Sequence, residues 1–216
     1  MVERLSESAR KILALANQEA QRLNHEYIGT EHILLGMIKE GSNVGAVTLK
    51  EKGIDLTKAR KEVEKLVRKG PEGISTMGKL PQTPRAKQAL IYALEELQKD
   101  GNASLIEGGH MLLGILREER GVATEAIMSM EQDPISIRRA LYQTLRIPVP
   151  NNFPPEFRPR PEIVKYLEGI VAQASVPDNE KPIDWVSEIQ RGTPTGRAIY
   201  PIIQTVYDTT QTESTK

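Results

Sequence analysis

The sequence predicts an all-α protein made of a duplicated, pseudo-twofold four-helix bundle with a proline-rich C-terminal extension. The first observation is a repeat: the segment 28–40 recurs at 106–118, shifted by 78 residues. A repeat of this length indicates a duplicated structural unit. The second is periodicity, because apolar residues return every three or four positions and nothing in 1–145 alternates with a period of two. Eight helices are therefore expected, with no sheet.

The first repeat, at about 3–70, is expected to form four helices. Ser6 is a suitable N-cap before an apolar stripe. The glycines that follow the later helical patterns are typical helix ends. The expected helices are at about 6–24, 30–40 and 43–52, with a fourth running from a Thr57 cap to Gly70.

The second repeat, at about 80–145, follows the same plan. Thr83 and Asp133 are expected N-caps, each followed by a proline at the first helical position. Two further helices are expected after Gly108 and at about 122–130. Gly36 and Gly114 fall inside helices, where glycine costs about 1 kcal/mol relative to alanine, so they predict close helix packing.

Composition removes several classes of function. The chain has 29 basic and 29 acidic residues, so it has no net charge with which to attract nucleic acid or an anionic membrane, and neither is an expected partner. Without cysteine there is no disulfide, thiolate nucleophile or thiol-ligated metal. The start lacks an apolar run, and no segment has about 18 consecutive apolar residues. A cytoplasmic location is expected.

The C-terminal part has a different character, since ten of the 14 prolines follow residue 145. Residues 146–161 are expected to be an extended linker. The extension 162–216 is expected to hold a helix from about Pro161 to Ala174, a shorter one after Asp184 that carries Trp185, and a disordered end from Asp208. Its apolar stripe must be buried, and docking on the bundles is favoured over docking on a partner.

The repeated string Gly-Thr-Glu-His-Ile-Leu-Leu-Gly at 29–36, the opening at 5–16 and the Thr-Pro-Arg-Ala-Lys at 83–87 resemble the N-terminal domain of the Clp unfoldases, most closely the ClpC-type branch. The resemblance covers about 3–145. It implies a pair of four-helix bundles that sits on an AAA+ ring and receives substrate or adaptor polypeptides without catalysing a reaction. Clp ATPase and protease components would be its partners.

The phosphate-binding motif Gly-x-x-x-x-Gly-Lys-Ser/Thr of such ATPases is absent, and the pair Gly192 and Gly196 has the wrong spacing. We therefore expect a free-standing recognition module, with an excised domain as the other reading. It is not expected to be an enzyme or to need a cofactor. The alternative function is a regulatory or structural scaffold that oligomerises or acts through the C-terminal extension.

The resemblance also implies ligand-binding residues, because ClpC-type N-domains can bind phosphoarginine. A carboxylate would hold the guanidinium and a helix N-terminus the phosphate. Ser6, Thr30 and Glu31 match the first pocket. Thr83 matches the second, where Gly109 replaces the carboxylate and Glu107 would need a different loop path. A purely structural role is the alternative: Ser6 and Thr83 would only cap helices, and Glu31 would only interact favourably with a helix dipole.

The histidines are not expected to bind metal. His32 and His110 share the apolar face of the repeat and are expected in the core, hydrogen-bonded. A metal site from His25, Glu31 and His32 is disfavoured, because His25 precedes the helix and neighbouring residues 31 and 32 point in different directions.

Overall fold

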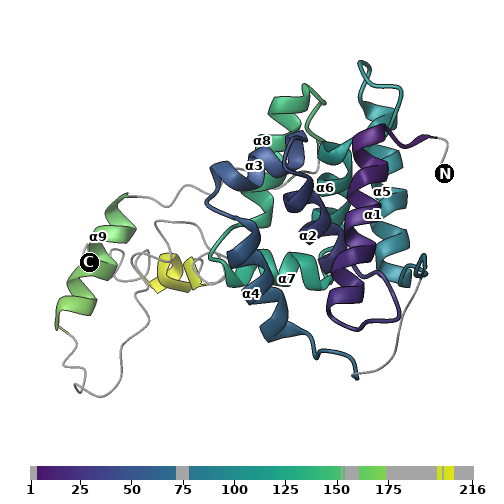
Figure 1. Cartoon of the computed structure of the whole chain (residues 1–216). Helices are drawn as coiled ribbons and strands as arrows, with labels where there is room; N and C mark the ends of the chain where they lie inside the picture. Colours follow the sequence, from purple (N-terminus) through teal and green to yellow (C-terminus); the bar gives the residue numbers. More distant parts are fainter. Residues whose placement is uncertain are drawn as a thin grey trace. The chain divides into compact units, whose positions relative to one another are not determined.

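The computed structural model describes residues 4–71, 78–151, 153, 161–173, 199–200 and 202–206 (Figure 1). The chain divides into two units, Met1–Phe153 and Pro154–Lys216, which are described separately. Within the described residues there are two isolated parallel β-bridges, Leu5 with Ile106 and Ile28 with Gln82, and no longer strand pairing. The prediction of an all-α fold is confirmed.

The first repeat forms α1 (Glu7–Arg22), α2 (Thr30–Glu40), α3 (Val44–Glu51) and α4 (Leu56–Leu66). Ser6 caps α1 as predicted, since Ala9 N–H donates to its Oγ at 3.1 Å. The predicted limits of α4 are wrong. Asp55 is its cap, with Lys58 N–H donating to Oδ1 at 2.9 Å. The helix ends at Leu66, because the chain then turns to α1, where Gly70 N–H donates to Leu23 O at 2.8 Å.

The second repeat forms α5 (Pro84–Lys99), α6 (Gly108–Arg117), α7 (Val122–Ser129) and α8 (Pro134–Leu145). Both predicted caps are confirmed. Ala86 N–H donates to Thr83 Oγ1 at 3.1 Å, and Ser136 N–H donates to Asp133 Oδ2 at 2.8 Å. Each is followed by a proline in the first turn, where its missing N–H costs nothing.

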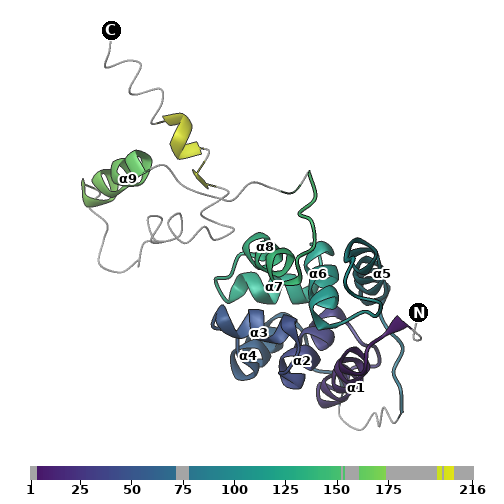
Figure 2. The same cartoon turned by 90° about the horizontal axis from the view of Figure 1, so that it is seen from above.

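Helices α2 and α6 form the middle of the bundle, each against the long first helix of its own repeat (Figure 2). Both are buried along most of their length. The prediction for the two mid-helix glycines is confirmed: a Cβ on Gly36 would lie 2.5 Å from Ile12 O, and one on Gly114 would overlap Ala89 O. Glycine therefore permits helix backbones to approach where alanine would separate them.

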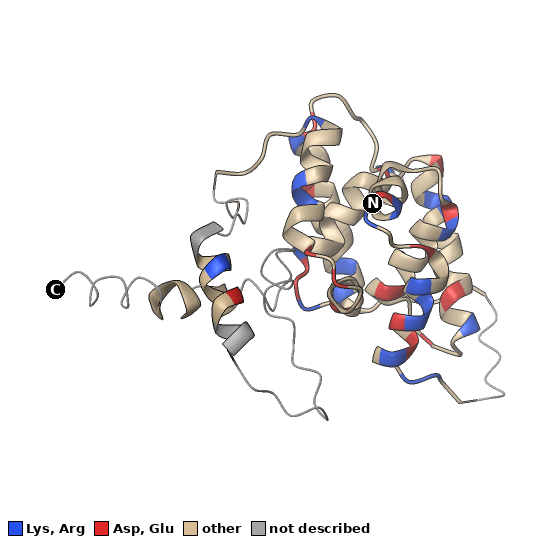
Figure 3. Cartoon of the chain, turned by 90° about the vertical axis from the view of Figure 1, so that its left-hand side faces the viewer, with Lys and Arg blue, Asp and Glu red and all other residues tan. Residues whose placement is uncertain are grey.

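Each repeat also buries one carboxylate among cations. Glu19 of α1 contacts Arg22, Lys39 and Arg60 at 2.6–3.2 Å. Glu96 of α5 contacts Lys99 and Arg117 and accepts from Tyr142 Oη at 3.3 Å. Other charges alternate in sign over the helices (Figure 3). The two clusters tie three helices of each repeat together through charge-assisted bonds.

The second unit contains α9 (Pro161–Gln173), the helix predicted there, and a short helical segment within 199–206. Ile163 and Leu167 of α9 are buried together with Tyr200 in a small core of this unit. Its partly buried neighbours are Val164, Ile199 and Ile203. The expectation that this stripe docks on the bundles stays a prediction; in the described part of the extension, Ile163 and Leu167 pack against Tyr200. The helix expected after Asp184 and the end from Asp208 lie outside the described residues.

Candidate functional site

A surface pocket of about 470 Å³ lies where the start of α2 meets the start of α5, and it therefore joins the two repeats. Backbone hydrogen bonds set this junction: Ile28 N–H donates to Pro81 O at 2.8 Å, and Thr83 N–H donates to Ile28 O at 2.9 Å. The volume is in the range of small-ligand sites. The pocket is lined by Asn24, His25, Glu26, Tyr27, Glu31, Gly70, Pro71 and Thr83.

The structure corrects the way in which the predicted residues were grouped. Glu31 lines a pocket with Thr83, the cap of the opposite repeat, and not with Ser6. Ser6 lies at the equivalent second junction, where its N–H donates to Ile106 O at 3.0 Å, just before α6. Each junction thus combines the first helix of one repeat with the second helix of the other.

Glu31 is the charged group at the inner side of this pocket. It lies in the first turn of α2 and is only 8% exposed. Burial raises the pKa of its carboxyl group. Among the described residues no Lys or Arg pairs with it, whereas the more deeply buried Glu19 contacts three. A buried carboxylate without a cation is costly, so the pocket favours a ligand that brings a positive charge.

Thr30, the fourth predicted ligand residue, is turned to the protein interior. It is 2% exposed and is not among the residues that line the pocket. Its Oγ1 accepts from Ala123 N–H of α7 at 3.3 Å and lies 3.5 Å from Glu31 Oε2. Thr30 therefore acts on the start of a helix of the other repeat and on the Glu31 carboxylate, and not directly on the pocket.

The second junction lacks the carboxylate of the first. Gly109 stands at the position equivalent to Glu31, and a Cβ placed there would lie 3.0 Å from a methyl group of Leu145. Glu107 is exposed before α6, and its N–H donates to His110 Nδ1 at 3.1 Å. The carboxylate is thus missing, and the side chain of Leu145 fills part of its space.

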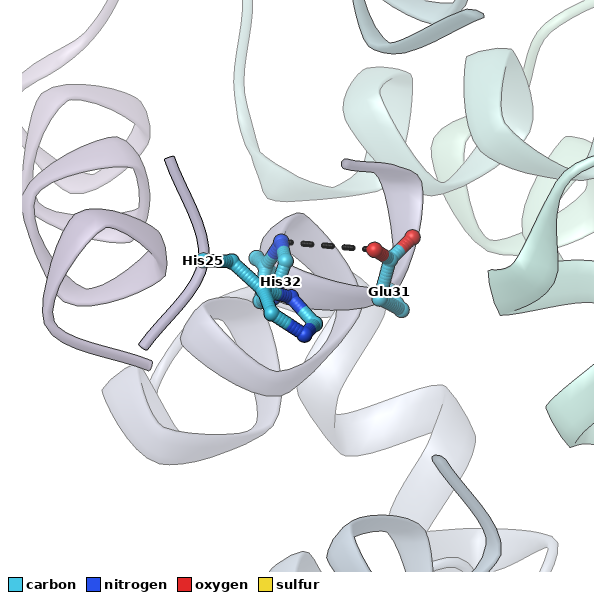
Figure 4. A group of neighbouring side chains, drawn as sticks. All are labelled: His25, Glu31 and His32. Carbon is cyan, nitrogen blue, oxygen red and sulfur yellow. Dashed lines mark hydrogen bonds and ion pairs between the residues drawn. The ribbon is translucent and has the colours of Figure 1, made fainter. Parts of the chain in front are cut away.

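A chain of hydrogen bonds, which we call the histidine relay, runs through His32 and His25 beside Glu31. Figure 4 shows the two rings and the contact between His32 and Glu31. Gly29 N–H donates to His32 Nδ1 at 2.8 Å, so the proton of this neutral ring is on Nε2, 3.0 Å from His25 Nδ1. The proton of His25 is then on Nε2, which donates to Arg68 O at 2.9 Å. The relay fixes both tautomers. Burial lowers the pKa of His32 to about 3, so this ring is neutral.

The structure brings His25, Glu31 and His32 closer than expected, with one ligand atom from each within 4.8 Å of the others. However, Glu31 Oε1 faces His32 Nδ1 at 3.4 Å, while His25 faces Nε2. Two nitrogens of one ring point in opposite directions, so a single ion could not join all three groups in place. The arrangement is better described as a hydrogen-bonded core, which was predicted for His32 and for His110.

Several pocket residues could not be identified from sequence. Asn24, Tyr27, Gly70 and Pro71 lie outside the repeated string and reach the pocket only through the fold. Asn24 has a left-handed backbone, with φ of 55°, and its Nδ2 donates to Gly70 O at 3.4 Å. The one signal was Tyr27, an aromatic residue directly before the string, which is 53% exposed.

Comparison with known proteins fits this architecture. Residues 4–130 and 83–175 match the family described as the Clp repeat (R) N-terminal domain. The chain belongs to this family. As a Clp N-domain it is 43% identical over 152 residues to the chloroplastic ClpA homolog, an ATP-dependent Clp protease ATP-binding subunit, of Brassica napus. It is 46% identical over 138 residues to the chloroplastic chaperone protein ClpC1 of Oryza sativa subsp. japonica.

These relatives are much longer proteins. The matches cover 70% and 64% of this Clp N-domain chain but only 17% and 15% of the Brassica and Oryza proteins. The chain therefore spans about a sixth of the length of the curated relatives it matches. The similarity is to their Clp N-domain.

Solved structures support the same fold. The N-terminal domain of the chaperone ClpD from Arabidopsis thaliana superposes with a TM-score of 0.57 at 22% identity, covering 68% of this chain and 97% of that one. The Hsp104 N-terminal domain from Candida albicans superposes with a TM-score of 0.54 at 16% identity, covering 65% of this chain and 90% of that one. Within the described part of this Clp N-domain chain, no helix has both the length and the apolar character to cross a membrane.

Proposed function

We propose that this chain is a recognition module of a Clp chaperone or protease system and binds substrate or adaptor polypeptides in the Glu31 pocket, without hydrolysing ATP itself. Membership of the Clp N-domain family supports this role, and the similar proteins are named as a chaperone and as an ATP-binding protease subunit. The cytoplasmic location and the lack of binding to nucleic acid or membranes stay predictions.

One observation supports the site: Glu31 is buried at a pocket with no Lys or Arg beside it in the described part of the chain. A guanidinium group would satisfy a buried carboxylate with two parallel hydrogen bonds. The same pocket contains Thr83 at the start of α5, a helix of 16 residues whose dipole favours an anion at that end. Phosphoarginine carries both charges on one side chain.

Titration calorimetry with a peptide that contains one phosphoarginine tests this function. We expect binding to the wild type and a loss of tenfold to a hundredfold in Glu31→Gln, because a charge-assisted contact contributes about 1.5–3 kcal/mol. Glu107→Gln is the matched control, since that glutamate is exposed just before α6, the helix of the second repeat that is equivalent to α2. Unchanged affinity in Glu31→Gln would refute the assignment. The same peptide with unmodified arginine measures the contribution of the phosphate.

A further inference from the structure

The histidine relay connects the Glu31 pocket to its wall. His25 lines the pocket, and its Nε2–H donates to Arg68 O at 2.9 Å. Two residues after Arg68, Gly70 forms part of the wall and is bonded to the end of α1, through Leu23 O at 2.8 Å. A single imidazole therefore links the buried start of α2 to the segment that closes one side of the pocket.

The second repeat has the same first step and a different acceptor. There Glu107 N–H donates to His110 Nδ1 at 3.1 Å, so His110 Nε2–H points at Asp100 Oδ2, 3.0 Å away. In the second repeat the acceptor is a carboxylate. In the first repeat it is His25, and imidazole is the side chain whose charge changes most readily near neutral pH. The two equivalent bonds therefore differ in whether their acceptor is an imidazole.

Adding a proton to His25 would disrupt the relay. The proton would go on Nδ1 and would face the hydrogen of His32 Nε2 across 3.0 Å. His32 cannot turn into an acceptor at Nε2 by moving its own proton, because Gly29 N–H occupies Nδ1 at 2.8 Å. The ring of His25 must then leave its place.

The charges around His25 favour a move into the pocket. Glu31 on α2 and Glu26 in the same loop also line it, and both are acidic. A protonated His25 would be drawn to these carboxylates and would compete with a cationic ligand. The other titratable or charged groups near the two rings are Arg68 after α4 and Glu19 and Arg22 of α1.

We propose that His25 is a positioning residue of the Glu31 pocket and that its protonation weakens ligand binding. The proposal rests on the proposed function, because it concerns the same pocket. It makes recognition by this chain stronger at neutral or mildly alkaline pH and weaker in mild acid. It also assigns a role to the one difference between the relay and its counterpart in the second repeat.

The variant that tests this is His25→Asn, whose amide oxygen can accept from His32 Nε2–H but does not titrate. The probe is a peptide with an acid-stable phosphonate analogue of phosphoarginine, titrated into the wild type and His25→Asn at pH 7.5 and 5.5. The titration of the probe is common to both proteins, and the comparison with His25→Asn includes the effect of His25 on the Glu31 carboxyl group, whose pKa it lowers. We expect the affinity of the wild type relative to His25→Asn to fall severalfold at the lower pH. An equal pH dependence in both proteins overturns the proposal.

A second measurement needs no ligand. Amide NMR signals of Gly29, Arg68 and Gly70 should shift between pH 7.5 and 5.5 in the wild type and stay constant in His25→Asn. Constant signals in the wild type overturn the proposal independently of binding. If neither protein binds the probe at either pH, the proposed function fails, and the amide signals alone decide whether His25 holds the pocket wall.

Discussion

Thr30 accepts a hydrogen bond from Ala123 N–H at 3.3 Å, and so the first residue of α2 caps α7 of the opposite repeat. Helix α7 needs this hydroxyl because its own N-cap is Gly121. The equivalent helix α3 is capped by its own Asn43, whose Oδ1 accepts from Ala46 N–H at 2.9 Å. There the residue opposite is Gly108, and a Cβ on it would overlap Asn43. At each of these two equivalent places, one residue carries the capping side chain and the residue opposite is a glycine: Thr30 faces Gly121, and Asn43 faces Gly108.

Thr30→Ala is predicted to cost about 1 kcal/mol of unfolding free energy, the usual value of an N-cap bond. Urea denaturation measures it. Thr30→Ser should retain most of the stability, because it keeps the hydroxyl and loses the methyl group. If Thr30→Ala unfolds at the same urea concentration as the wild type, Thr30 does not cap α7.

Much of this fold can be predicted from local signals. The shift of 78 residues identifies the duplication, and Ser6, Thr83 and Asp133 mark helix starts because a side-chain oxygen must satisfy N–H groups there. The limits of α4 were mistaken for a related reason. Asp55 and Thr57 are both acceptable caps, so residue type alone does not decide where α4 starts. Its end is followed by the bond from Gly70 N–H to Leu23 O, a contact that local sequence does not contain.

The pocket could be predicted only in part. Glu31 and Thr83 were identified residue by residue, but their grouping follows from backbone pairing between repeats, such as Ile28 N–H with Pro81 O. The start of a first helix could meet the start of the second helix in its own repeat or in the other repeat. The sequence repeat is identical in both cases. Nor could the sequence show that the hydroxyl of Thr30 is used inside the protein.

The Glu19 cluster predicts a dependence of stability on pH. Burial alone would raise the pKa of Glu19, but bonds from Arg60, Arg22 and Lys39 outweigh it and lower the pKa to about 2, from 4.5. The ionised group therefore stabilises the fold above pH 4.5, and this contribution is lost as the pH falls towards 2. Glu19→Gln should lower the free energy of unfolding by about 3 kcal/mol at pH 7.

Urea denaturation at pH 7 and pH 3 checks this, with Glu64→Gln as the control. Glu64 also bonds Arg22, at 2.6 Å, but its side chain is 47% exposed, so its loss should cost under about 1 kcal/mol. The difference in free energy of unfolding between the wild type and Glu19→Gln should be smaller at pH 3 than at pH 7. A gap of the same size at both pH values would contradict the assignment.

Gly114→Ala is predicted to destabilise the second repeat. The new methyl group would overlap the backbone at Ala89 and Ala93, so α5 and α6 must separate, at a cost of about 1–3 kcal/mol. Gly101→Ala is the control, because nothing lies within 4 Å of a Cβ there. Thermal unfolding should show a lower midpoint only for Gly114→Ala. Equal midpoints would mean that the helices do not approach this closely.

Truncation after Phe153 should leave recognition intact. Ile147 and Phe153 pack on the core of the first unit, so the cut must follow them. In the described part of the extension, Ile163, Leu167 and Tyr200 form a small core of their own. The affinity for the phosphoarginine peptide is expected to change less than twofold. Loss of binding together with a retained helical spectrum would favour the alternative function, a scaffold that acts through the extension.

The most direct test of a pocket shared between the repeats compares two caps of equal geometry. Ala9 N–H donates to Ser6 Oγ and Ala86 N–H donates to Thr83 Oγ1, both at 3.1 Å, so each alanine variant removes one cap at a similar cost in stability. Only Thr83 lines the pocket with Glu31. Calorimetry with the phosphoarginine peptide should show weaker binding in Thr83→Ala and wild-type affinity in Ser6→Ala. The reverse result would contradict the crossed arrangement and the recognition site built on it.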